Sequence, residues 1–213
     1  MGDGRDWYDW HLPYADAGSP LARRLLLVRR HIAGWLDERP DGPLSVVSVC
    51  AGQGHDLLGV LAARPADARR VRARLIEYDP RNVAAARAGA AAERLDGVTV
   101  VRADAGDPAS YAGVVPADLV LLAGVLGNVS DADARETIGA LPELCAPGAT
   151  VIWTRTRRAP DLTPAIRTWL ADAGFAERAF HAPQDVLFSV GVHRLLARPR
   201  PLTRTARLFR FAT

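Results

Sequence analysis

Strand-like and helix-like segments alternate along most of this chain, and no other feature constrains the fold as strongly. Five short runs are rich in β-branched residues or leucine and are bounded by Gly, Pro or Asp: residues 44–50, 71–77, 98–102, 117–123 and 149–154. Helical patterns separate them, at residues 55–63, 80–94, 108–112 and 131–144. Because a strand, a helix and a second strand in succession form a right-handed βαβ unit, the chain predicts an α/β fold with a mostly parallel sheet and helices on both faces.

Segments near both ends of the chain complete this pattern. Residues 20–36 predict an amphipathic helix, and the aromatic-rich segment 7–14 precedes it. After the fifth strand, residues 164–173 predict a helix, and two strand-like runs follow at 175–181 and 187–196. A short Pro-containing loop joins these two runs, so we expect a C-terminal antiparallel hairpin. A length of 213 residues suits one compact domain rather than two.

Composition narrows the class of function. All 27 basic residues are Arg, they are spread along the chain among 24 acidic residues, and the net charge is only +3. A nucleic-acid-binding protein concentrates positive charge on one face, so we expect no nucleic acid partner. The abundance of Arg and Ala, together with the absence of Lys, is typical of a GC-rich bacterial genome.

The cysteines and the N-terminus indicate the compartment. Cys50 and Cys145 have no metal-ligand spacing to another Cys or to a His, so we expect no metal site. Two thiols in core-like sequence fit a reducing cytosol. The first residues lack the apolar core of a signal peptide, and no run approaches the roughly 20 apolar residues of a membrane span. We therefore expect a cytoplasmic protein with no membrane partner.

The loop after the first strand is the strongest local motif. In VVSVCAGQGHDLLGVL, a buried strand runs into Gly52 and Gly54 and then into a helix. Glycines in such a loop let backbone amides approach a ligand at the positive end of the helix. A dinucleotide fingerprint needs a third Gly where this chain has Leu57, and a Walker loop needs a Lys. By itself, the Gly pair also fits a tight turn that binds nothing.

Acidic residues follow the next two strands. Glu77 ends the second strand, 25 residues after Gly52, where a carboxylate can accept hydrogen bonds from both hydroxyls of a ribose. Asp104 follows the third strand, where an acid can accept from an adenine amino group. Both also fit as helix caps, although Asp79 and Asp107 are better placed for capping because each directly precedes a Pro. The pattern favours a nucleotide crevice at the carboxyl end of the sheet.

Five segments together resemble the class I S-adenosylmethionine-dependent methyltransferases: VVSVCAGQG, LIEYDPRNVAAAR, VVRADAGD, ADLVLLAGVLGNVSD and PGATVIWTR. The resemblance covers about residues 44–196. It implies a Rossmann-like sheet of seven strands with one antiparallel strand near its edge, and S-adenosylmethionine as cofactor. The positions that it implies for cofactor binding are Cys50, Ala51, Gly52, Gln53, Gly54, Glu77, Tyr78, Asp104, Ala105 and Gly124.

The resemblance also implies a role for each part of this set. The glycine loop holds the amino acid end of the cofactor, and Glu77 holds the ribose. Asp104 and the Ala105 backbone read the adenine, and Tyr78 packs on its face. The chain departs from the family in the glycine loop, where Cys50 replaces the first Gly and Ser48 replaces the usual acid two residues earlier. Gln53 or a backbone carbonyl is then expected to accept from the cofactor's amino group.

Residues 1–40 are interpreted as an N-terminal helical lid over an S-adenosylmethionine-binding domain at 41–213. Methyl transfer needs a dry pocket, and it needs a base only when the acceptor must lose a proton. The aromatic rings in segment 7–14 are suited to enclosing a methyl group. His11 and Tyr14 in this segment, and Asn128 after the fourth strand, are the candidate catalytic residues. The rings also fit a purely structural attachment of the N-terminus, and Asn128 also fits a turn.

The predicted function is methyl transfer to an oxygen or nitrogen atom of a small molecule, in bacterial specialised metabolism. Other functions stay open. The same cofactor could supply its aminocarboxypropyl group for transfer or cyclisation, or the crevice could bind a nicotinamide. The chain could also be an adenosyl-binding module without catalysis, or methylate RNA. The sequence gives no indication of the oligomeric state.

Overall fold

A seven-stranded sheet forms the centre of the molecule in the computed structural model, which describes residues 6–202 and 207–211. The strands lie in the order β3-β2-β1-β4-β5-β7-β6. Only β7 runs antiparallel to its neighbours, β5 and β6. Their bounds are β1 Leu44–Val49, β2 Val71–Glu77, β3 Val98–Arg102, β4 Ala117–Leu122, β5 Cys145–Thr156, β6 Phe175–His181 and β7 Phe188–Leu195. The prediction of a Rossmann-like α/β fold with a C-terminal antiparallel hairpin is confirmed.

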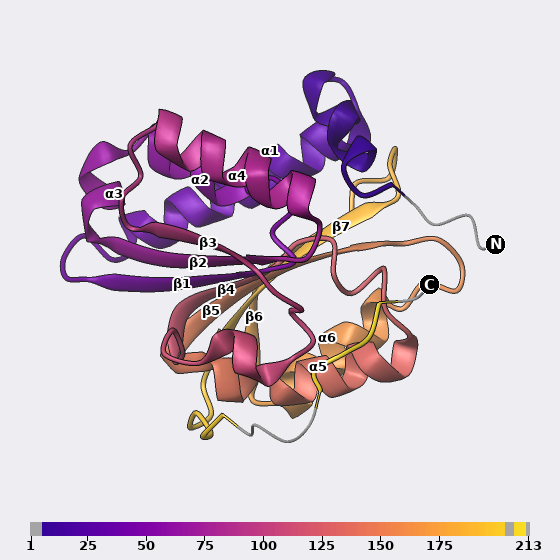
Figure 1. The fold of residues 1–213 in the computed structure, drawn as a ribbon. Coiled ribbons are helices and arrows are strands. Elements are labelled where there is room, and N and C mark those ends of the chain that lie inside the picture. Colours follow the sequence, from indigo (N-terminus) through magenta and orange to yellow (C-terminus); the bar gives the residue numbers. More distant parts are fainter. Residues whose placement is uncertain (1–5, 203–206, 212–213) are drawn as a thin grey trace.

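Helices cover both faces of the sheet (Figure 1). One face carries α1 (Pro20–Asp37), α2 (His55–Ala62), the short α3 (Pro65–Arg70) and α4 (Pro80–Ala92). The opposite face carries α5 (Asp131–Leu144) and α6 (Thr163–Asp172). There are also two short 3-10 helices in the described residues, η1 (Asp9–Ala15) and η2 (Pro108–Tyr111), and Tyr111 of η2 is buried in the core on the α5 and α6 face. Each face has its own hydrophobic core, because strands buried on both sides expose apolar side chains to both helical layers.

Capping residues fix where the helices begin. The side chains of Ser19, Asp79, Asp107 and Ser130 each accept a hydrogen bond from a backbone N–H in the first turn of the following helix. Pro occupies the first helical turn after three of these caps, where its missing N–H costs nothing. Asp79 and Asp107 therefore cap helices, as the sequence predicted, and this leaves Glu77 and Asp104 available for other contacts.

Two elements differ from the sequence expectation. Strand β5 begins at Cys145 rather than at residue 149, because Cys145 pairs with Ala117 before a bulge shifts the register. Gly148 lies in this bulge at a φ of 72°, which hid the strand pattern. Helix α3 has no apolar periodicity, and ion pairs from Asp67 to Arg64 and Arg70 hold it instead.

The antiparallel strand β7 contains a buried histidine. His193 is 1% exposed, and its Nδ1 accepts a hydrogen bond of 3.2 Å from Nε1–H of Trp153 on β5. The Trp153 ring lies against Gly191, where a Cβ would fall 2.3 Å from the indole. Burial lowers the pKa of His193 from 6.5 to about 4, so the imidazole is neutral at pH 7.

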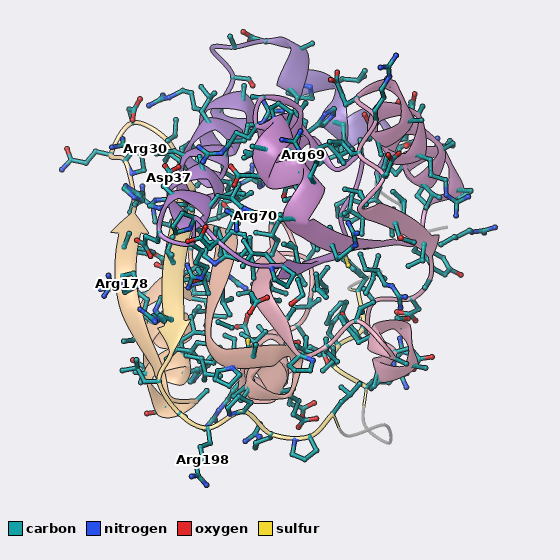
Figure 2. The ribbon with its side chains drawn as sticks, turned by 90° about the vertical axis from the view of Figure 1, so that its left-hand side faces the viewer. Arg30, Asp37, Arg69, Arg70, Arg178 and Arg198 are labelled. Atoms are coloured by element: carbon teal, nitrogen blue, oxygen red, sulfur yellow. The ribbon has the colours of Figure 1, made fainter. Side chains whose placement is uncertain are left out.

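The arginines do not form one basic face. Figure 2 shows Arg30 on α1, Arg178 on β6 and Arg198 beyond β7 pointing away from the protein in different directions. Many others pair with carboxylates, as Arg23 does with Asp185 and Arg167 with Glu177. No helix in the described part of the chain is long and apolar enough to cross a bilayer.

Candidate functional site: a cavity at the carboxyl end of the sheet

A cavity of about 500 Å³ lies where the parallel strands β1, β2, β3 and β4 end. In an open α/β sheet, ligands bind at this edge, and a volume of about 300–1,000 Å³ is typical of small-molecule sites. We call the loops that follow these strands, residues 50–54, 77–79, 104–106 and 123–124, the floor. Two terminal segments, residues 6–15 and 207–211, cover the cavity and are called the roof.

The glycine loop forms the centre of the floor. Cys50, Gly52 and Gly54 all adopt positive φ, at 51°, 55° and 73°. Gly is the residue that adopts such angles most readily, which explains why a Gly usually stands where this chain has Cys50. The pKa of the Cys50 thiol is raised by burial and by the charge of Glu77, so Cys50 lines the cavity as a small neutral group.

Glu77 connects this loop to the end of β2. Its Oε2 accepts from the N–H of Gly52 at 2.8 Å, and its Oε1 accepts from the N–H of Asp79 at 2.9 Å. The residue is 8% exposed and lines the cavity. Each carboxylate oxygen has a second lone pair, so both oxygens can also accept from a ligand hydroxyl. The structure therefore brings together the two groups that the sequence placed 25 residues apart.

Residues predicted to hold the adenine lie at one side of the floor. Tyr78 is 69% exposed and lines the cavity, so one ring face is free to stack. Asp104 accepts from the N–H of Gly106 at 2.8 Å through Oδ1, and from Nη2–H of Arg207 at 2.5 Å through Oδ2. Ala105 also lines the cavity. Arg207 thus occupies one of the two oxygens that the sequence assigned to adenine.

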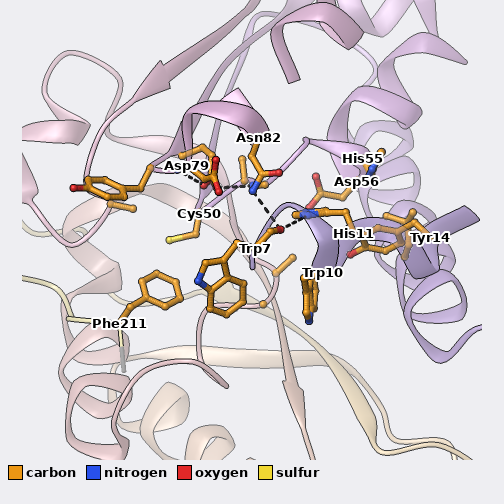
Figure 3. Close-up of a pocket in the computed structure, with 18 of the residues that line it drawn as sticks. Trp7, Trp10, His11, Tyr14, Cys50, His55, Asp56, Asp79, Asn82 and Phe211 are labelled. Carbon is orange, nitrogen blue, oxygen red and sulfur yellow. Dashed lines mark hydrogen bonds between the residues drawn. The ribbon is translucent and has the colours of Figure 1, made fainter. Parts of the chain in front are cut away.

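The N-terminal part of the roof is aromatic (Figure 3). Trp7, Trp10, His11 and Tyr14 line the cavity, and the rings of Trp10 and Tyr14 meet edge to face at 6.1 Å. His11 lies directly on the glycine loop, because a Cβ on Gly52 would fall 2.3 Å from His11 Nε2. Gly52 is therefore required both for its φ and for the close approach of the roof.

The hydrogen bond of His11 defines its tautomer. Nδ1 lies 2.8 Å from the carbonyl oxygen of Trp7, and a carbonyl can only accept, so Nδ1 carries the proton. Burial lowers the pKa of His11, which keeps the imidazole neutral at pH 7. Nε2 is then an unprotonated nitrogen with a lone pair at the wall of the cavity.

Tyr14 and His55 lie beside His11. Arg24 donates from Nη2 to the Tyr14 hydroxyl oxygen at 2.8 Å, and burial raises the pKa of Tyr14. His55 meets the Tyr14 ring at 5.1 Å, and burial lowers its pKa. This end of the cavity therefore holds a protonated phenol and two neutral imidazoles at pH 7.

Three predicted residues do not line this cavity. Gln53 faces a smaller pocket between α2 and α4, and its Nε2 lies 3.4 Å from Oδ1 of Asn82. Gly54 forms the N-cap of α2. Asn128 donates from Nδ2 to the carbonyl oxygen of Gly124 at 2.6 Å, and Gly124 itself lines the cavity. Their proposed contacts with ligands stay predictions, and Asn128 shapes the floor through Gly124.

Several cavity residues were missed by sequence reasoning. Arg207, Arg210 and Phe211 come from the C-terminal tail, which has no strand or helix periodicity. The tail is held by a hydrogen bond from Leu208 N–H to the Gly106 carbonyl, and Phe211 meets the Trp7 ring edge-on at 5.7 Å.

Two further missed residues, Arg24 and Asp56, line the cavity from α1 and α2. The position of Asp56, two residues after the glycine loop, was a usable signal.

The fold and the floor define a Rossmann-like protein of the class I methyltransferase type. The chain belongs to a methyltransferase family: the family model described as "Putative methyltransferase" matches residues 27–174. No curated protein sequence matches the chain significantly.

Solved structures share this fold. An O-methyltransferase family protein from Burkholderia thailandensis is 20% identical over 89% of this chain and 58% of its own, with a TM-score of 0.68. This chain therefore spans little more than half the length of that protein. Magnesium protoporphyrin IX methyltransferase from Synechocystis PCC 6803 with bound S-adenosylmethionine is 16% identical over 92% of this chain and 100% of its own, with a TM-score of 0.65. The same enzyme with bound S-adenosylhomocysteine is 17% identical over 87% and 92%, with a TM-score of 0.64.

The floor fits S-adenosylmethionine by its own geometry. The Glu77 carboxylate lies within hydrogen-bond distance of the Gly52 backbone at the wall of the cavity, and His11 covers the side of Gly52 where a Cβ would stand. Tyr78 offers an exposed ring face, and Gly124 adds no side chain to the opposite wall. Donors, acceptors and ring face are thus placed for an adenosyl group.

Proposed function

We propose that this protein transfers a methyl group from S-adenosylmethionine to a small-molecule acceptor. The observation that carries the proposal is the junction of the glycine loop and Glu77, joined by a 2.8 Å hydrogen bond on the floor of one cavity. In this proposal Glu77 holds the ribose, Tyr78 and Asp104 hold the adenine, and residues 6–40 of the predicted lid cover the cofactor. Residues 1–5 of that lid lie outside the described part of the chain.

The cofactor supplies an electrophilic methyl group on a positively charged sulfur. The protein's part is to hold an acceptor in line and to exclude water. Trp7, Trp10 and Phe211 support this proposal, because their rings form an apolar roof whose faces also attract a cation. The acceptor enters between this roof and Gly124.

His11 is the proposed base. Its unprotonated Nε2 takes the proton that an acceptor hydroxyl loses, while Nδ1–H stays bonded to the Trp7 carbonyl. Tyr14 stays protonated and can donate a hydrogen bond to the acceptor or hold the roof in place. A base and a hydrogen-bond donor side by side favour a hydroxyl acceptor, which must lose a proton, over an acceptor atom that reacts without losing one.

Cofactor binding is tested first with Glu77→Ala. Because a hydrogen bond to a charged group contributes about 1.5–3 kcal/mol, we expect S-adenosylhomocysteine to bind roughly 10- to 100-fold more weakly in calorimetry. Asp96→Ala, at an exposed position before β3, is the control and is expected to bind normally. Unchanged affinity in Glu77→Ala would remove Glu77 from the site.

The reaction type is tested by its products. Methyl transfer leaves S-adenosylhomocysteine, whereas transfer of the aminocarboxypropyl group leaves methylthioadenosine. Incubation with a panel of small phenols, carboxylic acids and amines is expected to yield S-adenosylhomocysteine with at least one hydroxyl compound. Binding without turnover on any acceptor would favour a non-catalytic adenosyl-binding module. A thermal shift with NADH in place of the adenosyl ligands would favour a nicotinamide enzyme.

A further inference from the structure

One end of the cavity carries two charged groups that the proposed ribose and adenine contacts leave unused. Arg24 on α1 and Asp56 on α2 both line the cavity. Figure 3 shows Asp56 beside His11 and Tyr14, at the end of the pocket away from Phe211. This end adjoins the glycine loop, because His11 lies against Gly52.

Asp56 is a buried carboxylate without a cationic partner. It is 8% exposed, and Oδ1 accepts from the N–H of Leu57, in its own helical turn, at 2.7 Å. Within residues 6–202 and 207–211, no side chain donates a hydrogen bond to it, although the charges of Arg24 and Arg29 both lower its pKa. A buried charge that is not paired is costly, and burial raises the pKa of Asp56 accordingly. A positively charged ligand group beside the Asp56 carboxylate would remove that cost.

Arg24 is a cation without an anionic partner. Its Nη2 donates to the Tyr14 hydroxyl at 2.8 Å, and its guanidinium lies 5.2 Å from the centre of the Trp10 ring. Among the described residues, no carboxylate lies within 4.0 Å of it. The charge of Arg24 nevertheless lowers the pKa of Asp56. The two groups therefore lie near each other in the cavity, but they do not form an ion pair. A guanidinium has five N–H donors, so most remain for a ligand.

We propose that Asp56 and Arg24 form a clamp for an α-amino acid group, with Asp56 accepting from the ammonium and Arg24 donating to the carboxylate. This inference rests on the proposed function, since the ligand group is the amino acid end of S-adenosylmethionine. The sequence supports it, because Ser48 stands where an acid is expected on β1, and Ser48 is buried and does not line the cavity. In this proposal, Asp56 on α2 replaces the acid that is missing from β1, and Arg24 on α1 adds a contact to the carboxylate.

The clamp is tested by binding, with adenosyl ligands that differ at the amino acid end. Decarboxylated S-adenosylmethionine also carries a sulfonium methyl group that the other two ligands lack, so its affinity is compared only between the wild-type protein and each variant. S-adenosylhomocysteine carries both groups, decarboxylated S-adenosylmethionine lacks the carboxylate, and 5′-methylthioadenosine lacks both. From the range for charged hydrogen bonds, the wild-type protein is expected to bind S-adenosylhomocysteine at least about tenfold more tightly than methylthioadenosine. Asp56→Asn is expected to remove about tenfold from S-adenosylhomocysteine affinity and nothing from methylthioadenosine affinity. Arg24→Met is expected to weaken S-adenosylhomocysteine by about tenfold and to leave decarboxylated S-adenosylmethionine unchanged.

Matched controls separate the clamp from a loss of folding. Arg30→Met changes an exposed Arg on the same helix and is expected to bind all three ligands normally. Equal losses for S-adenosylhomocysteine and methylthioadenosine in the Asp56 and Arg24 variants would overturn the clamp, and so would equal wild-type affinities for both ligands. The equal-affinity outcome can be measured on the wild-type protein and would overturn the clamp even if a variant does not fold. Failure of the wild-type protein to bind any of the three ligands would instead contradict the proposed function.

Discussion

The floor and the roof of the cavity are built in opposite ways. The floor continues buried parallel strands, whose residues Val49, Ile76 and Leu122 are at most 1% exposed. The N-terminal segment of the roof has no buried residue in η1, and its Asp6 pairs with Arg81 of α4 at half-exposed positions. The C-terminal segment is anchored more firmly, because Leu208 and Phe209 are buried in the core. Exposed ion pairs contribute at most about 1 kcal/mol each, whereas burying a large apolar side chain contributes about 1.5–3 kcal/mol.

This difference suggests that the floor positions the cofactor and that the roof controls access to it. A floor that is fixed by the sheet can present Gly52 and Glu77 in one geometry before any ligand arrives. The N-terminal segment of the roof, which is held by weak contacts, can open for an acceptor and close again, as is typical of segments with few buried contacts. Variants of the floor should therefore change stability and cofactor affinity, and variants of the roof should change turnover.

The largest expected effect is a loss of folding stability in acid, caused by His193 in the sheet. His193 has a pKa of about 4 when folded, against an ordinary value of 6.5 in an unfolded chain, so between these pH values only the unfolded chain binds the proton. Stability is then lost as pH falls from about 6.5 to 4, and this one residue accounts for about 3 kcal/mol of the loss.

Urea unfolding at pH 7 and pH 4 measures this loss directly. Comparison with His193→Gln isolates it, because the amide oxygen can still accept from Trp153 and does not titrate. An equally steep pH dependence in the variant would show that other groups are responsible.

His11→Ala is expected to have the largest effect among roof variants. Loss of a general base lowers turnover by about 100-fold or more, while cofactor affinity should change by less than about threefold. In the wild-type protein, the rate should fall in acid, as the pH passes through the lowered pKa of His11 and Nε2 is protonated.

Tyr14→Ala should lower turnover in the same direction but by less, and Tyr14→Phe separates the hydroxyl from the ring. Steady-state kinetics and calorimetry on the same samples test these expectations. A normal rate in both His11→Ala and Tyr14→Ala would exclude a catalytic role for this segment.

The contact between Trp7 and Phe211 should couple the two halves of the roof. The rings meet edge-on at 5.7 Å, and such pairs contribute about 0.5–1.5 kcal/mol beyond burial. A double-mutant cycle of Trp7→Leu and Phe211→Leu, scored by acceptor KM, should show a coupling energy in that range. Additive effects would mean that the N-terminal and C-terminal segments move independently.

The smallest effect is expected from Arg207→Ala. Its ion pair with Asp104 is half-exposed, so global stability should fall by no more than about 1 kcal/mol. Freeing Asp104 should leave adenosyl affinity unchanged or increase it by a few fold, as calorimetry with 5′-methylthioadenosine can measure. Weaker binding would show that Arg207 supports the ligand rather than competing with it.

Local patterns in the sequence were sufficient for the floor. The β-branched runs, the Gly52 loop and the acid that ends the second strand are all short-range features, and the helix caps at Asp79 and Ser130 depend on residues within one turn. Such patterns carry their own physical cause, since periodicity records burial and a cap satisfies neighbouring N–H groups. The sheet type followed from them, whereas the cofactor class followed from the family resemblance that these segments carry.

The roof, and the pairing of charges beneath it, were decided only by the tertiary structure. Trp7 and Phe211 lie near opposite ends of the sequence, and no local pattern around either residue indicates that they are in contact. The same holds for Arg207 on Asp104 and for Arg24 facing Asp56 across two helices. Contacts of this kind exist only after the sheet has brought its strand ends, its first helix and its tail to one edge, because the driving force is shared burial rather than local preference.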